Sequence, residues 1–521
     1  MERHTNESSQ GEIGRVELGK ERNLSRFYKS LATDKELLDL ETLSKQYIAG
    51  EWRDGFSQNR FLDLNPYDGS TVAEIRLASV QDIDEAYQAA QRAQREWAKV
   101  NPFVKRDIME KAAQVVEQYA EDIANLMAKE IGGTYLKAMI EVMFVKNAIR
   151  EAATYPMRME GKILPSSIDG KENRLFRLPI GVVAVISPFN FPMILTVRAV
   201  AAALGTGNGI VIKPHEESAL SGGTLVAKIF EEAGIPKGLL NVVVADIKEI
   251  GDAFVEHPIP GVISFTGSTS VGRHIGEAAS RNLKRVSLEL GGNSAFLVLD
   301  DADVDYAVDA AAFSRFTHQG QICMCANRVI VHRAVYDEFV EKFVKKAAGL
   351  KIGDPSDKST IIGPLINQRQ VQGLLRVVEE SVNQGARIAY QGPVQGNLVG
   401  PIVLAEVNET MSCSQQEMFG PVVAIMPVES EEEAIAIANN SAYGLTGAVH
   451  TKNLERGVDV AKRIESGMVH VNDVTVNDEP LVAFGGEKGS GVGRYNGQWA
   501  LEEFTTLKWI SVQYEKRQYP F

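Results

Sequence analysis

Two of the three cysteines in this 521-residue chain, Cys323 and Cys325, stand one residue apart in the stretch FTHQGQICMCANR. A thiolate is a strong nucleophile toward a carbonyl carbon, so either cysteine could carry covalent catalysis. A metal site would need further soft ligands at a characteristic spacing, and a disulfide across one residue would close a strained ring. Most free cysteines are small buried hydrophobic residues, and composition alone favours that interpretation here.

The histidines do not supply the ligands that a metal site would lack. All eight are scattered, no H-E-x-x-H occurs, and no second pair of cysteines follows the first. We therefore expect no structural metal. Three cysteines are also too few for the disulfide framework of a secreted protein, which indicates a reducing compartment, the cytoplasm.

Other candidate residues stand where predicted strands end, because open parallel sheets bind ligands at the carboxyl ends of their strands. The segment RVSLELGGN ends a strand at Glu289. A carboxylate in such an apolar context is costly unless it is used or paired, so Glu289 is a candidate base. After GVVAVIS comes PFNFP, and after GIVI comes KPHE. Its Lys213 and Glu216 could bind ribose hydroxyls, or they could simply be polar side chains exposed to solvent.

The segment TGSTSVG follows another predicted strand and opens a helix. Gly267 and Gly272 stand on either side of Ser268, a layout that lets backbone N–H groups and a hydroxyl meet a pyrophosphate at the helix N-terminus. A turn with an ordinary N-cap would give the same pattern. No single motif among these identifies a function.

The elements that must position these residues follow from hydrophobic periodicity. Apolar residues at three- and four-residue intervals predict helices over 82–100 and 104–131. Short β-branched runs then alternate with helical stretches, which is typical of parallel sheets with crossover helices. The first set of strands is predicted at 181–187, 209–214, 239–246 and 261–268, with a helix at 218–234. The second set is predicted at 293–300, 326–333, 421–428 and 467–473, with a helix at 336–349.

A separate β segment is predicted between the first helices and the first sheet. Residues 159–181 alternate apolar and polar side chains around an Asp-Gly turn and predict a hairpin. Nothing local would bury its outer face. Paired with the β-like tail 504–514, it is a candidate for extending a sheet across a subunit interface.

Composition restricts the partners. The formal net charge of −13 and the lack of a long Lys/Arg run argue against nucleic-acid binding. The polar N-terminus has no apolar core of a signal peptide, and no long uncharged apolar run predicts a membrane span. We expect small-molecule partners, and we expect residues 1–40 to form an N-terminal extension.

In their order, the motifs resemble the signatures of the aldehyde dehydrogenase superfamily over about residues 40 to 515. The matching stretches are SPFNFP, KPHE, FTGSTSVG, LELGGN, GQICMCANR, QEMFGPV and GGEKGSGVGR. The resemblance implies an α/β fold with two α/β domains that contain parallel sheets, plus a small bridging β domain. It implies a coenzyme-binding domain (41–156 and 180–290), a catalytic domain (291–490) and oligomerisation β segments (157–179 and 504–521) of a homodimer or homotetramer.

The same resemblance assigns roles residue by residue. The nucleophile is Cys323, the base Glu289 and the oxyanion-binding amide Asn190, whereas Cys325 has no catalytic role. The resemblance further implies that NAD, or NADP as the alternative, would bind through a set made of Ile186, Phe189, Lys213, Glu216, Gly267, Ser268, Gly272, Glu417 and Phe419.

The expected activity is NAD(P)-dependent oxidation of an aldehyde to the carboxylic acid through a cysteine thiohemiacetal and thioester. A CoA-acylating dehydrogenase and a non-redox thiol esterase or acyl transferase are the alternatives. The motif GQICM, Arg198 and Tyr495, which stands where many members have glutamate, resemble the aromatic-aldehyde branch, with benzaldehyde- or vanillin-type substrates. The expected substrate pocket consists of Phe191, Ile322, Met324 and Phe484.

Overall fold

The computed structural model describes residues 37–521. Most of the expected N-terminal extension, 1–40, therefore lies outside the described residues. Leu37 is already buried in the core of the first lobe, and a short helix, α1 (Leu40–Leu43), follows it. Packed structure thus begins before residue 40.

The first large sheet has the strand order β2-β1-β9-β8-β7-β10-β11-β23. Its five central strands are parallel: β9 (Leu240–Val242), β8 (Gly209–Lys213), β7 (Val182–Ile186), β10 (Val262–Thr266) and β11 (Arg285–Glu289). The edges are antiparallel and consist of β1 (Gln46–Ile48), β2 (Glu51–Arg53) and β23 (Gly491–Val492). The four strands predicted between 181 and 268 are all present.

The chain order reverses within this sheet. The chain passes from β7 outward through β8 and β9, then returns to lay β10 and β11 on the other side of β7. Such a switch point opens a crevice at the carboxyl ends of the strands. Helices cover both faces, and alternate residues of β7 divide between them: Val183 and Val185 pack into one core, Val182 and Ala184 into the other.

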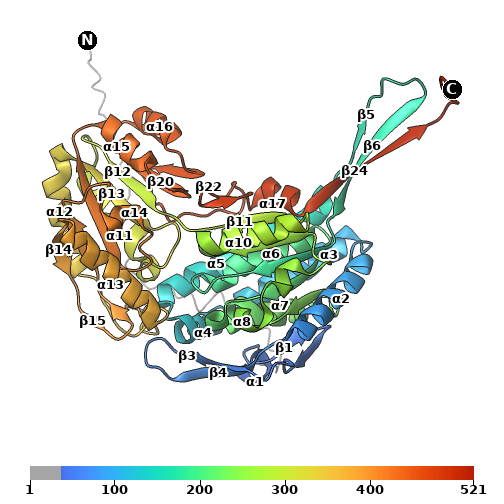
Figure 1. Cartoon of the computed structure of the whole chain (residues 1–521), viewed down its shortest axis with the longest axis horizontal. Helices are drawn as coiled ribbons and strands as arrows, with labels where there is room; N and C mark the ends of the chain where they lie inside the picture. Colours follow the sequence, from blue (N-terminus) through green and yellow to red (C-terminus); the bar gives the residue numbers. More distant parts are fainter. Residues whose placement is uncertain (1–36) are drawn as a thin grey trace, which may run out of the picture. The chain divides into compact units, whose positions relative to one another are not determined.

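The second large sheet has the order β14-β17-β18-β13-β12-β20-β21. All of its strands are parallel except the edge strand β14 (Arg387–Gln391). The others are β12 (Ser294–Val298), β13 (Ala326–His332), β17 (Ile402–Ala405), β18 (Val422–Val428), β20 (Thr446–His450) and β21 (Met468–Val471). One face is covered by α11 (Val304–Phe316) and α12 (Arg333–Ala348), the other by α13 (Gln368–Asn383), α15 (Glu431–Asn439) and α16 (Leu454–Arg463). The expected fold class, two α/β lobes with parallel sheets, is confirmed (Figure 1).

The helical stretch predicted over 104–131 consists of two helices. α3 (Pro102–Gln118) and α4 (Ala120–Ile131) are separated at Tyr119, whose φ of −105° and ψ of 21° leave the helical region. The stretch 218–234 is also divided, into a π-helical turn, η4 (Leu220–Thr224), and α7 (Leu225–Ala233). The remaining long helices are α2 (Val80–Trp97), α5 (Tyr135–Ala152), α6 (Pro192–Gly205) and α10 (Thr269–Arg281).

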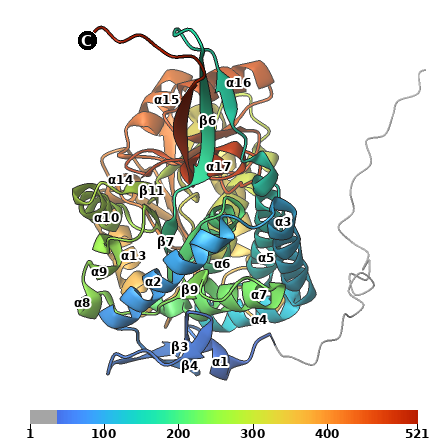
Figure 2. The same cartoon turned by 90° about the vertical axis from the view of Figure 1, so that its right-hand side faces the viewer.

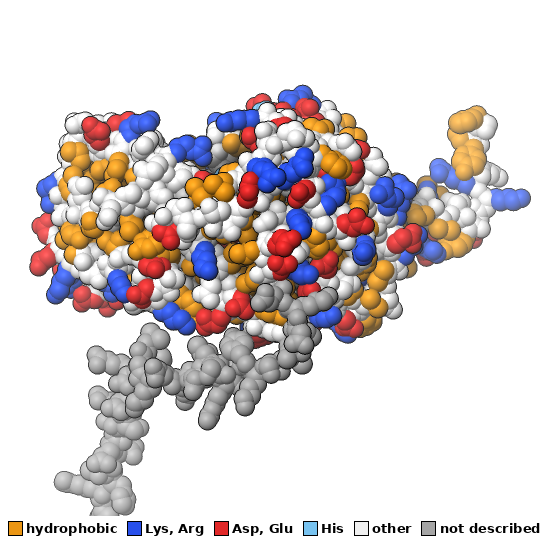
Figure 3. All heavy atoms as spheres, turned by 90° about the horizontal axis from the view of Figure 1, so that it is seen from below, with side chains coloured by type: hydrophobic (Ala, Val, Ile, Leu, Met, Phe, Trp, Pro, Cys, Tyr) orange, Lys and Arg blue, Asp and Glu red, His pale blue; other side chains and the backbone are white. Residues whose placement is uncertain are grey.

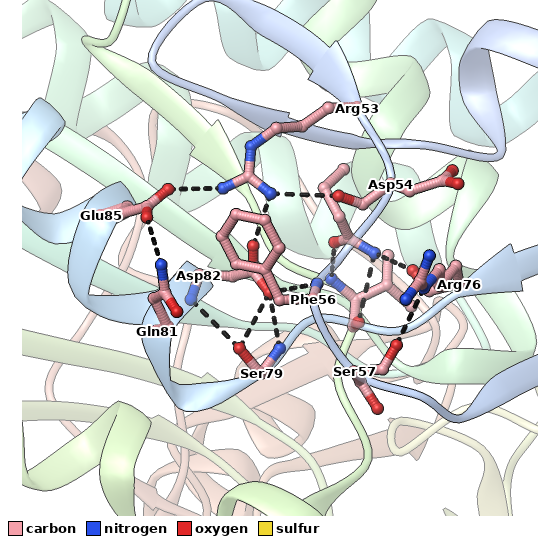
Figure 4. Close-up of polar contacts among 11 residues, drawn as sticks. Arg53, Asp54, Phe56, Ser57, Arg76, Ser79, Gln81, Asp82 and Glu85 are labelled. Atoms are coloured by element: carbon pink, nitrogen blue, oxygen red, sulfur yellow. Dashed lines mark hydrogen bonds and ion pairs between the residues drawn. The ribbon is translucent and has the colours of Figure 1, made fainter.

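The start of α2 is fixed by side chains (Figure 4). Ser79 and Asp82 form a capping box, in which each side chain accepts a hydrogen bond from the other residue's backbone N–H. Arg53 of β2 pairs with Asp82 at 2.6 Å and with Glu85 at 2.7 Å. The backbone N–H of Phe56 also donates to Asp82 at 2.8 Å. These contacts hold the edge of the first sheet against α2.

The predicted hairpin pairs with the predicted tail. β5 (Lys162–Leu164), β6 (Lys171–Pro179) and β24 (Thr505–Gln513) form an antiparallel three-stranded sheet, and Gly170 takes the left-handed φ of 66° in the turn. The strands extend away from the helices around α17 (Gly497–Glu503) in Figures 1 and 2. The side chains of Ile163 and Trp509 on this sheet are 72% and 65% exposed. A second antiparallel hairpin joins β3 (Arg60–Leu64) to β4 (Thr71–Arg76).

The shorter elements are α8 (Ile247–Ile250), α9 (Ala253–Glu256), α14 (Ser412–Gln415), η2 (Tyr155–Arg158), η3 (Glu216–Ser218), η5 (Thr317–Gly320), β15 (Val394–Gln395), β16 (Leu398–Val399), β19 (Tyr443–Gly444) and β22 (Glu487–Lys488). No helix within residues 37–521 is long and apolar enough to cross a membrane. On the face drawn in Figure 3, the coloured cationic and anionic side chains are interspersed rather than gathered by sign.

Candidate active site

A cleft of about 300 Å³ receives residues from both sheets. The segments that follow β7, β10 and β11 meet there with the segments that precede β13 and β18. The carboxyl edge of the first sheet therefore faces the amino edge of the second. Seven of the candidate residues line this cleft: Phe189, Asn190, Gly267, Ser268, Cys323, Glu417 and Phe419.

Cys323 is half-buried and follows the short helix η5, in which His318 and Gln319 have left-handed φ values of 51° and 55°. The segment after β11 packs directly against the backbone of Cys323 at Gly292. Only glycine fits there, since a Cβ would lie 2.0 Å from the carbonyl oxygen of Cys323. Burial, with the charges of Glu417 and Glu289 nearby, raises the pKa of the Cys323 thiol well above its usual range. The nucleophile therefore needs a base.

Glu289 ends β11 and is 3% exposed. Neither of its carboxylate oxygens has a hydrogen-bond partner within residues 37–521. Burial raises the pKa of Glu289 to about 8, an effect that Arg198 and Arg494 oppose and Asp478 reinforces. A buried carboxylate with such a pKa is a better proton acceptor than an exposed one once it is ionised, and the ionised fraction grows as pH rises through about 8.

Asn190 is buried at the carboxyl end of β7. Its Nδ2 donates to the carbonyl oxygen of Gln321 at 2.9 Å. An amide nitrogen has two N–H groups, so this bond orients the side chain and leaves one donor. Asn190 and Cys323 line the same cleft, where that donor can stabilise an oxyanion.

Ser268 caps α10, and its Oγ accepts from the N–H of Val271 at 3.5 Å. The N-terminus of α10 thereby opens into the cleft, where free N–H groups can bind a phosphate. Gly267 allows close packing, because a Cβ there would lie 2.4 Å from the ring of Phe265. Gly272 does not line the cleft. It lies within α10, where a Cβ would be 2.2 Å from the side chain of Leu290.

Lys213 ends β8, and its Nζ pairs with Oε1 of Glu216 at 3.0 Å. Neither residue lines the cleft itself. Three aromatic rings link this pair to the cleft. The ring centroid of His215, which follows Lys213 by two residues, lies 5.4 Å from that of Phe189, and the centroid of Phe189 lies 5.9 Å from that of Phe419; both contacts are edge to face. Ile186, at the end of β7, is half-buried and packs against the core on the α2 and α10 side.

Glu417 precedes β18 and accepts from the backbone N–H of Gly292 at 3.0 Å. Burial raises the pKa of Glu417 to about 7, and the buried guanidinium of Arg315 opposes this rise. The two glycines of LELGGN therefore allow close approach to two different site residues, Glu417 and Cys323. Gly291 lies close to the carboxylate of Glu417, and Gly292 lies against the backbone of Cys323.

The four expected substrate-pocket residues, Phe191, Ile322, Met324 and Phe484, are all buried, and none lines the cleft. The ring of Phe484 lies 4.0 Å under the guanidinium of Arg198. Other residues line the cleft that sequence reasoning did not single out: Leu195, Thr266, Leu290, Gly291 and Gln370. Thr266, Leu290 and Gly291 belong to the motifs TGSTSVG and LELGGN, whereas Gln370 reaches the cleft from α13 and has no local signal.

Cys325 is buried, and its sulfur contacts the carbonyl oxygen of Arg315 at 3.7 Å. All three cysteines are free. Across residues 37–521, no three His, Cys, Asp or Glu side chains gather as a metal ion would require.

A thiol, an amide donor and a helix N-terminus line one cleft. Glu289 does not line it, but its unpaired buried carboxylate lies near enough to Cys323 to affect the pKa of the thiol. Together these groups define an enzyme of the cysteine-dependent, nucleotide-binding class. Residues 52–510 match the model of the aldehyde dehydrogenase family. Benzaldehyde dehydrogenase YfmT of Bacillus subtilis is 60% identical over 485 residues, which cover 93% of this chain and 100% of that protein.

Solved structures agree. An NAD-dependent benzaldehyde dehydrogenase from Corynebacterium glutamicum is 44% identical with a TM-score of 0.84, covering 90% of this chain and 98% of that one. A salicylaldehyde dehydrogenase from Pseudomonas putida G7, complexed with salicylaldehyde, is 36% identical with a TM-score of 0.89, covering 92% and 99%. The chain therefore belongs to the aldehyde dehydrogenase family, and the resemblance in its motifs is confirmed.

Proposed function

We propose that this enzyme oxidises aromatic aldehydes to carboxylic acids with NAD as coenzyme. The observation that carries the proposal is the sharing of one cleft by Cys323, Asn190, Ser268 and Glu417. The names of its relatives, which act on benzaldehyde and salicylaldehyde, support the aromatic substrate class.

Catalysis begins when the sulfur of Cys323 attacks the aldehyde carbon and its proton passes to Glu289. The carbonyl oxygen becomes an oxyanion, which the free N–H of Asn190 stabilises. A bound NAD supplies the acceptor for the hydride that leaves the substrate carbon. The thiohemiacetal thereby becomes a thioester.

Hydrolysis of the thioester regenerates the enzyme. Glu289, after releasing its first proton to solvent, takes a proton from water, and the resulting hydroxide adds to the thioester carbon. The carbon–sulfur bond then breaks, the carboxylic acid leaves, and the thiolate of Cys323 is restored. The free carboxylate oxygens of Glu289 support this role, because no other group competes for them within the described residues.

The residues at the cleft fit a dinucleotide. Gly267, Ser268 and the N-terminus of α10 would hold the pyrophosphate, and Lys213 with Glu216 would bind the adenosine ribose. Gly272 would act through the close packing of α10. Glu417 would bind the nicotinamide ribose, with Phe419 beside the nicotinamide ring. Phe189 lines the cleft, as proposed for both Ile186 and Phe189, but Ile186 does not. The carboxylate of Glu216 would repel the 2′-phosphate of NADP, which favours NAD, although Lys213 beside it weakens the effect.

The apolar side chains around the cleft, among them Leu195, Leu290 and Phe419, favour a flat substrate. Burying an aromatic ring contributes about 1.5 to 3 kcal/mol. The proposed substrate pocket of Phe191, Ile322, Met324 and Phe484 stays a proposal: Phe191 follows Asn190 in the chain and Ile322 and Met324 flank Cys323, but none of the four lines the cleft.

The test is a panel of benzaldehyde, vanillin, salicylaldehyde and acetaldehyde, assayed with NAD and with NADP. We expect a higher kcat/KM for benzaldehyde than for acetaldehyde, and free benzoate as the product. A ratio of one or less refutes the aromatic class. A product that requires CoA would identify an acylating dehydrogenase, and turnover of esters without coenzyme would identify a thiol esterase.

We also infer that the chain assembles as a homodimer or homotetramer through residues 157–179 and 504–521. The exposed apolar side chains of the β5–β6–β24 sheet support this, since a free sheet edge of this kind usually finds a partner. Residues 41–156 and 180–290 would form the coenzyme-binding domain, and 291–490 the catalytic domain. The free cysteines are consistent with a cytoplasmic location.

A further inference from the structure

Two charged side chains of α5, Lys137 and Glu141, form an ion pair in the interior. Both are 0% exposed, and Nζ of Lys137 lies 2.5 Å from Oε2 of Glu141. Neither residue lines the cleft. Because two ions lose their water, apolar residues of similar volume often give equal or greater stability than such a pair. The pair therefore points to a use other than stability.

The second oxygen of Glu141 caps α6. Its Oε1 accepts from the backbone N–H of Met193 at 2.8 Å and of Ile194 at 3.0 Å. The N-cap residue of α6, Phe191, makes no side-chain capping bond of its own. Free N–H groups and the positive end of the helix dipole favour a carboxylate here. Glu141 thus supplies from a neighbouring helix the cap that the local sequence lacks.

This cap lies next to Asn190 in the chain, with only Phe191 between Asn190 and the start of α6. Nζ of Lys137 lies 4.3 Å from the centroid of the Phe191 ring. The same Phe191 ring also packs edge to face against the ring of His318, with 5.6 Å between the two ring centroids. The ion pair therefore contacts the segment that follows Asn190, and through Phe191 it reaches the turn that leads to Cys323.

Asn190 itself makes one bond to that turn, from Nδ2 to the carbonyl oxygen of Gln321. The direction of its second N–H depends on where the backbone of residues 190–192 lies. We propose that Glu141, held by Lys137, is a positioning residue that fixes the start of α6 and so aims the amide of Asn190 at the substrate oxygen. The inference rests on the proposed function, because it takes Asn190 as the oxyanion donor.

Coenzyme binding should be largely independent of the Lys137–Glu141 pair. The groups proposed to bind NAD, the N-terminus of α10 and Glu417, belong to elements other than α5 and α6. A double-mutant cycle tests the link. Lys137→Met/Glu141→Leu removes both charges and the cap while keeping apolar volume. Because a displacement of about 1 Å can cost about 100-fold in rate, we expect kcat/KM for benzaldehyde to fall about 10- to 100-fold. The Kd for NAD should stay within about threefold of the wild-type value.

The same two changes made in an Asn190→Ala background should lower kcat/KM by less than about twofold further, because the group that they position is already absent. The matched control is Lys137→Met/Glu141→Gln. It keeps a side-chain oxygen that can accept from Met193 and Ile194, so it should retain kcat/KM within about threefold of wild type.

Equal losses in the two backgrounds overturn the proposal, because the effect would then not pass through Asn190. Unchanged kcat/KM in the Leu variant, or no recovery in the Gln control, overturns it as well. If the Leu variant does not fold, Glu141→Asp enters the same cycle, since it keeps the negative charge but draws the carboxylate back from α6. Full activity of Asn190→Ala alone would instead refute the oxyanion role, and a wild-type enzyme without NAD-linked aldehyde oxidation would refute the proposed function itself.

Discussion

Glu289→Gln removes the one ionisable group at the carboxyl end of β11, and its effect can be worked out from the burial of that group. Burial raises the pKa of Glu289 from its ordinary value of 4.5 to about 8. A tenfold change in an ionisation constant corresponds to about 1.4 kcal/mol, so ionising Glu289 inside the protein costs about 5 kcal/mol more than in water. For the same reason the carboxylate is a stronger base than an exposed one.

The kinetic consequence has a defined direction. Glu289 is protonated below pH 8 and can accept a proton only above it, so kcat/KM of the wild type should rise with pH through about 8. The thiol of Cys323 has a pKa raised well above this window and does not contribute the inflection. In Glu289→Gln the inflection should disappear, and kcat should fall by about 100- to 10,000-fold, as losses of a general base do.

Stability changes in the opposite sense. Between pH 4.5 and 8 the unfolded chain releases the proton of Glu289 while the folded chain keeps it, so the wild type loses stability as pH rises through this window. Glu289→Gln has no such loss. The difference in thermal midpoint, variant minus wild type, should therefore increase from pH 5 to pH 8. A wild-type rate profile without an inflection between pH 7 and 9, or the same inflection in Glu289→Gln, would refute the reasoning.

Four further outcomes are expected. Cys323→Ala should abolish NAD-linked oxidation while Cys325→Ala keeps most of it, and equal losses in the dehydrogenase assay would contradict the assignment. Gly292→Ala should inactivate the enzyme while the soluble protein keeps its secondary structure, because the added Cβ would lie 2.0 Å from the backbone oxygen of Cys323. A normal kcat in this variant would show that the segments around Gly292 and Cys323 do not approach so closely. The KM for NAD should be lower than for NADP, and Glu216→Gln should narrow the difference by removing a repulsion of up to about 4 kcal/mol; a lower KM for NADP in the wild type would contradict this. Trp509→Glu should lower the molar mass measured by light scattering, because it charges an exposed apolar strand; an unchanged mass would exclude this face as the interface.

The sequence by itself determined most of the secondary structure and seven of the candidate residues that line the cleft. Strand alternation and helical periodicity depend on neighbours in the chain, so the strands around 182–186 and 262–266 and the pairing candidates 159–181 and 504–514 could be predicted. The helical character predicted over 104–131 is confirmed, but the break at Tyr119 between α3 and α4 could not be predicted, because Tyr119 departs from helical geometry without a Gly or Pro to signal it.

Only the tertiary structure decided how the two sheets meet. The rule that ligands bind at the carboxyl ends of strands locates Asn190 and Ser268, but Cys323 and Glu417 stand before their strands, at the amino edge of the second sheet. The cap that Glu141 supplies to α6 and the absence of Phe484 from the cleft lining are likewise invisible in the sequence. Each depends on the approach of segments far apart in the chain, which packing sets and local residue preference does not.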